Sequence, residues 1–381
     1  MYHDLADALV AHDVDLDVIA IDWRKVDQSN GYATSGSSTK YRLFRYQPLE
    51  LALPGAVSLG LKWIASSLIC VPRLIGLLIQ NKYSVVVAQT PAALWAPLFI
   101  CRLFSNAKLY LVQWDFTPYH QRAIGMMGSG PAFNFLLFLE NMAIKNFDII
   151  GCMSPKNIDY LKAHYKISSR QKVELLPIWA APGFPPAVPR DEIRRIHDLP
   201  VHAKLAVFGG TLSKGRGIED IVLAATKAAG RYPDLHFLIV GSGPLENEVR
   251  EMAAGLDNLA VRRGLPREDY LALLKAADAG IVATERGTGV PTFPSKTMDY
   301  FRAGVPVVAS VEDSTDFGEF LMAEKAGRAV KAGDPEELLA QIVNITSDKK
   351  ASEALVGNGR RLLDTYFGVD KIACQILSIA S

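Results

Sequence analysis

The sequence predicts an α/β protein built from two Rossmann-like domains. Short apolar runs alternate with segments of helical periodicity along the chain, which is typical of parallel sheets covered by helices. The chain has 381 residues, enough for two separate cores. Residues 177–190 carry five prolines and a glycine, and a fresh α/β pattern begins after them. We therefore interpret this stretch as a linker rather than a long surface loop within one domain.

The composition indicates a folded chain and argues against some classes of function. Hydrophobic residues make up 49% and charged residues 21%, as in folded chains. The net charge of +1 argues against a dedicated nucleic-acid binder. The four cysteines are far apart and form no C-x-x-C pair, so we expect buried thiols in a reducing compartment, the cytoplasm. The chain begins with acidic residues and no apolar core segment, which indicates no signal peptide.

The first half starts with a helix-like segment, residues 3–12, and a strand-like run, Val14–Ile21. A parallel sheet normally starts with a strand and a glycine-rich turn, and both are missing here. We therefore expect a truncated or misassigned start. Residues 27–40 are small and polar, which indicates a loop.

Residues 49–79 form the most hydrophobic segment, with helical stretches at 56–80. Its longest uncharged run, Leu51–Leu61, is too short to span a bilayer core of about 30 Å. Packing in the core and contact with a membrane surface both fit. Residues 40–180 hold fifteen Lys/Arg against six Asp/Glu, which suits an anionic membrane, although a solvated basic face is the simpler explanation.

The remaining first half alternates regularly between strands and helices. One strand leads into a polar and aromatic loop, residues 113–120, in which Asp115 and His120 are candidate site residues. Their simpler roles are a carboxylate that caps a helix and a surface histidine. Glu140, Asn141 and Lys145 share one helical face, for which solvation is the simpler explanation. The expected strands are Ser84–Ala88, Lys108–Val112, Asp148–Cys152 and Val173–Leu176, and the expected helices are Ala92–Phe104, Pro131–Lys145 and Pro155–Tyr165.

The second half repeats the pattern, and glycine-rich loops follow its strands. The loop Gly209–Gly217 follows a strand and opens a helix, as a phosphate-binding loop does. A tight turn with solvated basic residues is the simpler alternative. The expected strands are Leu205–Gly209, His236–Gly241, Leu259–Arg263, Gly280–Ala283, Val305–Val311 and Arg328–Val330, and the expected helices are Ile218–Ala229, Glu246–Ala254, Arg267–Ala277, 296–303, 335–345, 351–366 and 370–378.

The stretch Ile281–Val311 reads as strand, polar loop, short helix and strand, a βαβ crossover. Pro294-Ser295-Lys296 opens the helix and Gly304 closes it. In an open parallel sheet such a loop lies at the carboxyl ends of the strands, where ligands bind. Its backbone N–H groups and helix N-terminus suit a phosphate.

The order of the motifs GGTxxKG, GSGP, RGLP and PSKxMDYFxAGxPVVA, over residues 204–311, resembles the retaining GT-B glycosyltransferases of group 1. The resemblance implies two domains facing across a cleft. It also implies that Lys214 binds the donor diphosphate and that Asp299, in place of the usual glutamate, holds the ribose hydroxyls. The full set of implied donor-binding residues is Gly210, Thr211, Lys214, Arg216, Gly241, Gly264, Leu265, Glu285, Ser295, Lys296, Thr297 and Asp299.

The sequence departs from the family pattern in two places. The family has two glutamates separated by seven residues, whereas Pro291 stands eight positions before Asp299, and Glu285 is out of register. This Pro-Ser-Lys form implies phosphate contacts from the helix start. Thr211 stands where an arginine is usual, and Arg216 is a candidate to compensate.

The resemblance implies transfer of a sugar, with retention, from a nucleotide diphosphate sugar to a hydroxyl of a saccharide or lipid-linked acceptor, without metal or cofactor. Asp115 and His120 would serve this reaction from an acceptor domain. The expected divisions are 1–180, a linker at 181–190, a donor domain at 191–360, and helices at 361–381 that cross back to the first domain. We expect a cytoplasmic protein, with peripheral contact to the inner membrane surface and no nucleic-acid partner. A GT-B epimerase or phosphorylase and an inactive GT-B scaffold are the alternatives.

Overall fold

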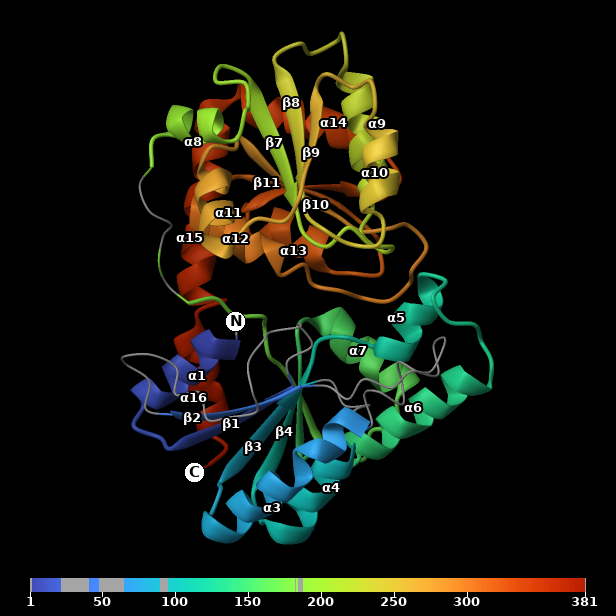
Figure 1. The fold of residues 1–381 in the computed structure, drawn as a ribbon, viewed down its shortest axis with the longest axis vertical. Coiled ribbons are helices and arrows are strands. Elements are labelled where there is room, and N and C mark those ends of the chain that lie inside the picture. The colour runs from blue at the N-terminus through green and yellow to red at the C-terminus, as the bar shows by residue number, and fades with distance from the viewer. Residues whose placement is uncertain are drawn as a thin grey trace. The chain divides into compact units, whose positions relative to one another are not determined.

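The computed structural model describes residues 2–21, 41–47, 65–89, 95–181, 183 and 188–380. The chain divides into two compact units (Figure 1). Unit 1 comprises Met1–Ala181 and Val369–Ser381, and unit 2 comprises Pro182–Gly368. Both units are α/β with parallel sheets. The loop expected at 27–40 and the apolar residues 48–64 lie outside the described residues.

Unit 1 contains a four-stranded parallel sheet in the order β3-β4-β5-β6 and a separate parallel pair, β1-β2. The two central strands, β4 and β5, are buried almost throughout, which explains their continuous apolar sequences. The strands are β1 (Leu16–Ile21), β2 (Tyr41–Tyr46), β3 (Val85–Gln89), β4 (Lys108–Gln113), β5 (Ile149–Cys152) and β6 (Lys172–Leu175). The helices are α1 (Tyr2–Ala11), α3 (Val71–Gln80), α4 (Trp95–Phe104), α5 (Thr117–Ala123), α6 (Pro131–Ile144), α7 (Pro155–His164) and α16 (Val369–Leu377).

The start of α7 illustrates how sequence sets these boundaries. The Ser154 side chain accepts a hydrogen bond from the backbone N–H of Asn157, and Pro155 occupies the first turn. By contrast, the expectation of a loop through His120 is wrong, because Thr117 to Ala123 form α5. The helix has Pro118 in its first turn and too few apolar residues to show a helical period.

The C-terminal helix α16 packs in unit 1 rather than unit 2. Its residues Val369, Ile372 and Ile376 share a core cluster with Leu5 and Leu9 of α1. The backbone N–H of Val369 also donates to the carbonyl of Ala180 (3.1 Å). The first and last helices of the chain are therefore neighbours.

Unit 2 contains a six-stranded parallel sheet in the order β12-β11-β10-β7-β8-β9. Figure 1 shows α9, α10 and α14 on one face, with α11, α12 and α15 on the other. The strands are β7 (Lys204–Gly209), β8 (Leu235–Val240), β9 (Leu259–Arg262), β10 (Ala279–Ala283), β11 (Val307–Val311) and β12 (Gly327–Lys331). The helices are α8 (Arg190–Ile196), α9 (Ile218–Ala228), α10 (Glu246–Met252), α11 (Arg267–Lys275), α12 (Lys296–Ala303), α13 (Phe317–Ala323), α14 (Pro335–Ser347) and α15 (Lys349–Thr365).

Two further features bear on the sequence predictions. Among the described residues, no helix is long and apolar enough to cross a membrane. Cys70, Cys101 and Cys152 are buried as expected, but Cys374 is exposed. The expectation of four buried thiols is wrong for Cys374, because it lies on the outer face of α16, opposite the buried Ile372 and Ile376.

Candidate functional site

The strand order of unit 2 creates a switch point at the carboxyl edge of its sheet. From β7 the chain continues to β8 and β9 on one side, and then returns to β10 and β11 on the other. The loops that follow β7 and β10 therefore diverge at this edge. Crevices at such a point are where ligands bind to open α/β sheets.

The loop after β7 carries glycines whose conformations other residues rarely adopt. Gly210, Gly215 and Gly217 have φ values of 150°, 87° and 56°. A Cβ atom on Gly217 would lie 2.6 Å from the carbonyl oxygen of Thr284, which follows β10. Glycine thus allows the β7 and β10 loops to pack together directly before α9.

Glu285 ties the same two loops together. Its Oε2 accepts a hydrogen bond from the N–H of Gly215 (2.5 Å), and its own N–H donates to the carbonyl of Gly215 (3.2 Å). Glu285 is out of register with the family glutamate, and these two hydrogen bonds show that it holds the glycine-rich loop in place.

Lys296, the first residue of α12, is the most unusual ionisable group of this edge. Its Nζ lies 3.6 Å from the centre of the Phe208 ring, is buried, and has no hydrogen-bond partner. A Cβ on Gly210 would lie 3.3 Å from this nitrogen, so the amine faces the glycine-rich loop. Burial, together with the positive charge of Arg216, lowers the pKa of Lys296 well below its ordinary value. A helix N-terminus favours an anion, and this buried amine has no hydrogen-bonded anion beside it.

The flanking candidates have different surroundings. Lys214, Arg216 and Thr211 are exposed on the β7 loop. Ser295 is exposed before α12 and makes no side-chain cap. The hydroxyl of Thr297 is buried without a hydrogen-bond partner.

The Asp299 carboxylate forms an ion pair with Arg267 in this structure. Arg267 at the start of α11 donates to both carboxylate oxygens, at 2.7 Å and 3.3 Å, and Arg302 lies 3.8 Å away. The Asp299 side chain is 16% exposed and that of Arg267 is 60% exposed. A ribose hydroxyl that binds Asp299 must therefore share this carboxylate with Arg267.

The loops after β8 and β9 support the β7 loop from the side. A Cβ on Gly241 would overlap the carbonyl of Gly210, so glycine is required there for packing. Ser242 accepts a hydrogen bond from the N–H of Gly264 (3.2 Å). Leu265 is half-buried beside it.

Tyr300 is a positioning residue that falls within the motif PSKxMDYFxAGxPVVA but was not among the predicted site residues. Its buried hydroxyl lies 2.9 Å from the carbonyl of Ile281 and 3.2 Å from that of Val207, and it accepts from the N–H of Gly209 (3.2 Å). It thereby fixes α12 against β7 and β10. Its place in that motif, four residues after Lys296 on the same helix face, was the signal of this role.

Glu312 organises the remainder of the β10 loop. Its carboxylate accepts from the backbone N–H groups of Gly287, Thr288 and Gly289 and from the hydroxyls of Thr288 and Ser314. Burial acts to raise the pKa of Glu312, but these hydrogen bonds outweigh it and lower the pKa.

In unit 1, Asp115 is exposed after β4, and its carbonyl accepts from the Gln113 side chain (2.7 Å). His120 is half-buried within α5. The expectation of a solvated Glu140 is wrong: it is fully buried and accepts from the Tyr165 hydroxyl (2.6 Å). Burial raises the pKa of Glu140 to about 8, although the bond from Tyr165 lowers it.

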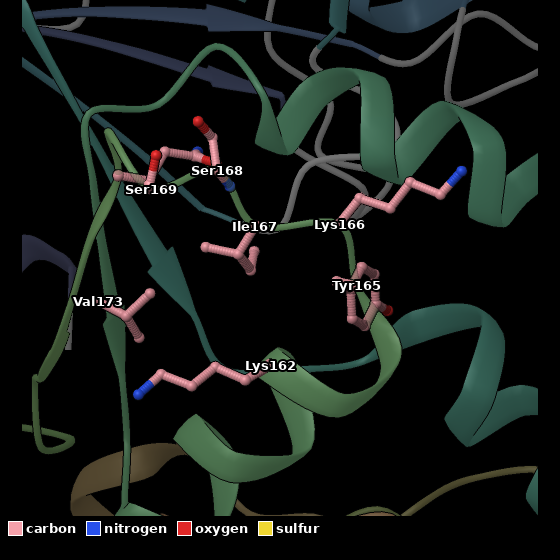
Figure 2. A pocket seen from close by; sticks show the side chains of 8 residues that line it. Lys162, Tyr165, Lys166, Ile167, Ser168, Ser169 and Val173 are labelled. Atoms are coloured by element: carbon pink, nitrogen blue, oxygen red, sulfur yellow. The ribbon is translucent and has the colours of Figure 1, made fainter.

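A surface depression in unit 1 lies away from the carboxyl edge of its sheet. Figure 2 shows it between the end of α7 and the start of β6, lined by residues that include Lys162, Ile167 and Val173. The segment between α7 and β6 enters β6 at its amino end. This depression is therefore not continuous with the candidate site residues after β4.

Potential metal ligands come together in unit 1. Among the described residues, the one group of His, Cys and carboxylate side chains close enough to share an ion is His12, Asp370 and Cys374. No described residue of the unit 2 loops belongs to such a group. The loops of unit 2 instead offer cations, N–H groups and a helix N-terminus, which suit an anion.

Comparisons with known proteins agree with this chemistry. Residues 189–362 match the family "Glycosyl transferases group 1". The chain is 26% identical over 272 residues to the putative colanic acid biosynthesis glycosyl transferase WcaI of Escherichia coli, covering 68% of this chain and 65% of the relative. It is 28% identical over 168 residues to the phosphatidyl-myo-inositol mannosyltransferase of Mycolicibacterium smegmatis, covering 44% and 42%. These matches span less than two thirds of either relative.

A solved structure shows the same fold over nearly the whole chain. Sucrose-phosphate synthase from Thermosynechococcus elongatus superposes with a TM-score of 0.74 at 19% identity, covering 99% of this chain and 91% of that one. The expected GT-B class of fold is therefore confirmed, whereas the roles of individual site residues stay predictions.

Proposed function

We propose that this chain, whose residues 189–362 match the family "Glycosyl transferases group 1", transfers a sugar from a nucleotide diphosphate sugar to an acceptor hydroxyl. The observation that carries this proposal is the buried, unpartnered Nζ of Lys296 facing the glycine-rich loop. A donor diphosphate at the switch point supplies the anion that this amine lacks.

The residues of unit 2 would act mainly on the leaving group. As the bond between the sugar carbon and the diphosphate breaks, negative charge grows on the phosphate oxygens. Lys296, Arg216 and the N-terminus of α12 would stabilise that charge. The acceptor oxygen forms the new bond to the sugar, and the departing phosphate can take the acceptor proton. Asp299 would hold the ribose hydroxyls. Retention of configuration is part of the proposal and rests on the family resemblance.

The acceptor is proposed to be a saccharide or lipid-linked saccharide at the cytoplasmic face of a membrane. The relatives named for colanic acid and phosphatidyl-myo-inositol chemistry support this class of acceptor. Exposed apolar side chains on the adjacent helices α4 and α6 also support it. They are Phe99, Leu103, Phe104, Phe135, Phe138 and Met142.

The part of the sequence that includes α4 and α6 is also basic, because residues 40–180 hold fifteen basic against six acidic residues. A peripheral protein needs both an apolar face and attraction to anionic lipid. We expect the chain to sediment with anionic vesicles more than with neutral ones. Replacing Phe99 and Phe138 with serine should reduce sedimentation with both. Equal binding of the variant and the parent would contradict this role for α4 and α6.

The experiment that tests the function is a panel of UDP-, GDP- and ADP-sugars with and without saccharide acceptors. Binding would be measured by calorimetry and transfer by mass spectrometry, with NMR of the product to assign the anomeric configuration. We expect one nucleotide class to bind and its sugar to be transferred or slowly hydrolysed. Failure of all nucleotide diphosphates to bind would refute the proposal, and an inverted product would refute retention alone.

A further inference from the structure

Three potential metal ligands meet on the surface of unit 1. His12 follows α1, and Asp370 and Cys374 lie on α16. Nε2 of His12 is 2.9 Å from Oδ1 of Asp370 and 3.6 Å from Sγ of Cys374. One ligand atom from each side chain lies within 4.8 Å of the other two. We propose that these three side chains bind a zinc ion, with water as the fourth ligand.

The backbone holds the three groups in place before any metal binds. Asp370 and Cys374 are four residues apart and therefore share one face of α16. The N–H of His12 donates to the carbonyl of Leu9 (3.1 Å), which fixes the turn after α1. The two helices pack through Leu9 and Ile372 in one core cluster. A preorganised site of this kind loses little entropy on binding.

The distances suit zinc. Tetrahedral zinc, with bonds of about 2.0–2.1 Å to nitrogen and about 2.3 Å to sulfur, holds these two atoms roughly 3.5 Å apart. The observed separation of Nε2 and Sγ is 3.6 Å. The carboxylate of Asp370, at 2.9 Å from Nε2, needs to move outward by only a few tenths of an ångström. Imidazole, thiolate and carboxylate together favour zinc over magnesium or calcium, which prefer oxygen ligands.

Binding requires two changes of proton position and no redox change. Cys374 binds as a thiolate and releases its proton to water. His12 presents the lone pair of Nε2 to the metal, so its ring proton resides on Nδ1. The ion then joins residues 358 positions apart in sequence, His12 and Asp370, and stabilises the packing of α1 on α16.

The test uses the full chain, without a histidine tag, titrated with Co²⁺ and then Zn²⁺. We expect one equivalent of Co²⁺ to give a thiolate-to-cobalt charge-transfer band and the intense visible bands of tetrahedral cobalt, and Zn²⁺ to abolish both. Zinc should also protect one fast-reacting thiol from Ellman's reagent, because Cys374 is the exposed cysteine. The melting temperature should rise by roughly 5 °C at zinc about 100-fold above its dissociation constant.

Matched variants separate this site from adventitious binding. Cys374→Ser should lose the charge-transfer band. His12→Gln should weaken Co²⁺ binding at least about tenfold. Loss of a residue that only hydrogen-bonds to a metal ligand already costs about this much affinity, and loss of the ligand itself should cost no less. All three ligands are exposed, so circular dichroism should show unchanged folding. His202→Gln, an exposed histidine of unit 2, is the control and should bind as the parent does. A parent protein without the charge-transfer band, or equal binding by His12→Gln, would overturn the proposal.

Discussion

Replacing Lys296 with methionine should weaken donor binding without destabilising the fold. Methionine keeps the contact with Phe208 but removes a buried amine that has no hydrogen-bond partner. Burying an unsatisfied polar group costs about 1–3 kcal/mol. The free energy of unfolding of the nucleotide-free variant should therefore be unchanged or higher than that of the parent.

Nucleotide binding should weaken in the same variant. Removing one partner of a buried charge pair costs about 2–5 kcal/mol. Each 1.4 kcal/mol, roughly, changes the dissociation constant tenfold. A loss of about 2–4 kcal/mol, in the lower part of this range, therefore raises the dissociation constant about 30- to 700-fold. Calorimetry with the nucleotide diphosphate that binds the parent measures this change. Lys227→Met, an exposed lysine in the last turn of α9 paired with Glu336, is the control and should leave binding unchanged.

The pH dependence follows from the direction of the pKa shift. Lys296 has a lowered pKa in the nucleotide-free protein, and a bound diphosphate should raise it. Between these two pKa values binding takes up a proton, so the affinity should fall as pH rises, by at most about tenfold for each pH unit. Measurements above about pH 7.5 avoid titration of a terminal phosphate with a pKa of about 6. A Lys296→Met protein that binds as tightly as the parent, with the same pH profile, would refute this reasoning.

Three further predictions concern residues that support the loops and the core. Gly217→Ala should lower the free energy of unfolding by more than about 1 kcal/mol, because φ is 56° and the new Cβ would meet Thr284. Urea titration measures this change, and an unchanged urea midpoint would contradict it. Glu285→Gln should weaken nucleotide binding more than it lowers the melting temperature, because it loosens the loop at Gly215; a variant that binds as the parent does would exclude this role. The raised pKa of Glu140, about 8, means that stability should fall as pH rises from about 4.3 to 8, and Glu140→Gln should flatten this profile in denaturant titrations.

Much of the fold was predictable because its signals are local. Alternating apolar runs and the capping residues Ser154 and Gly304 mark elements within a few positions of themselves. The short helix α5 was missed because its seven residues include too few apolar positions to show a period. Local signals also placed the glycine-rich loop and the start of α12 correctly after β7 and before β11.

The surroundings of individual side chains were less predictable, because they depend on residues distant in sequence. Glu140 is buried because Tyr165, 25 residues later, supplies its hydrogen bond. Glu285 holds Gly215, which lies 70 residues earlier. Similarly, the ion pair of Asp299 with Arg267 joins α11 to α12. A motif gives the identity of such a residue but not the partner that defines its chemistry.

Hydrogen–deuterium exchange with and without the nucleotide diphosphate that binds best would test the central claim most directly. In the proposed complex the diphosphate lies between the loops that follow β7 and β10. We therefore expect slower exchange of backbone N–H groups in residues 209–217 and 284–297 when the nucleotide is bound. Protection confined to other segments, with these two loops exchanging at their nucleotide-free rates, would contradict it.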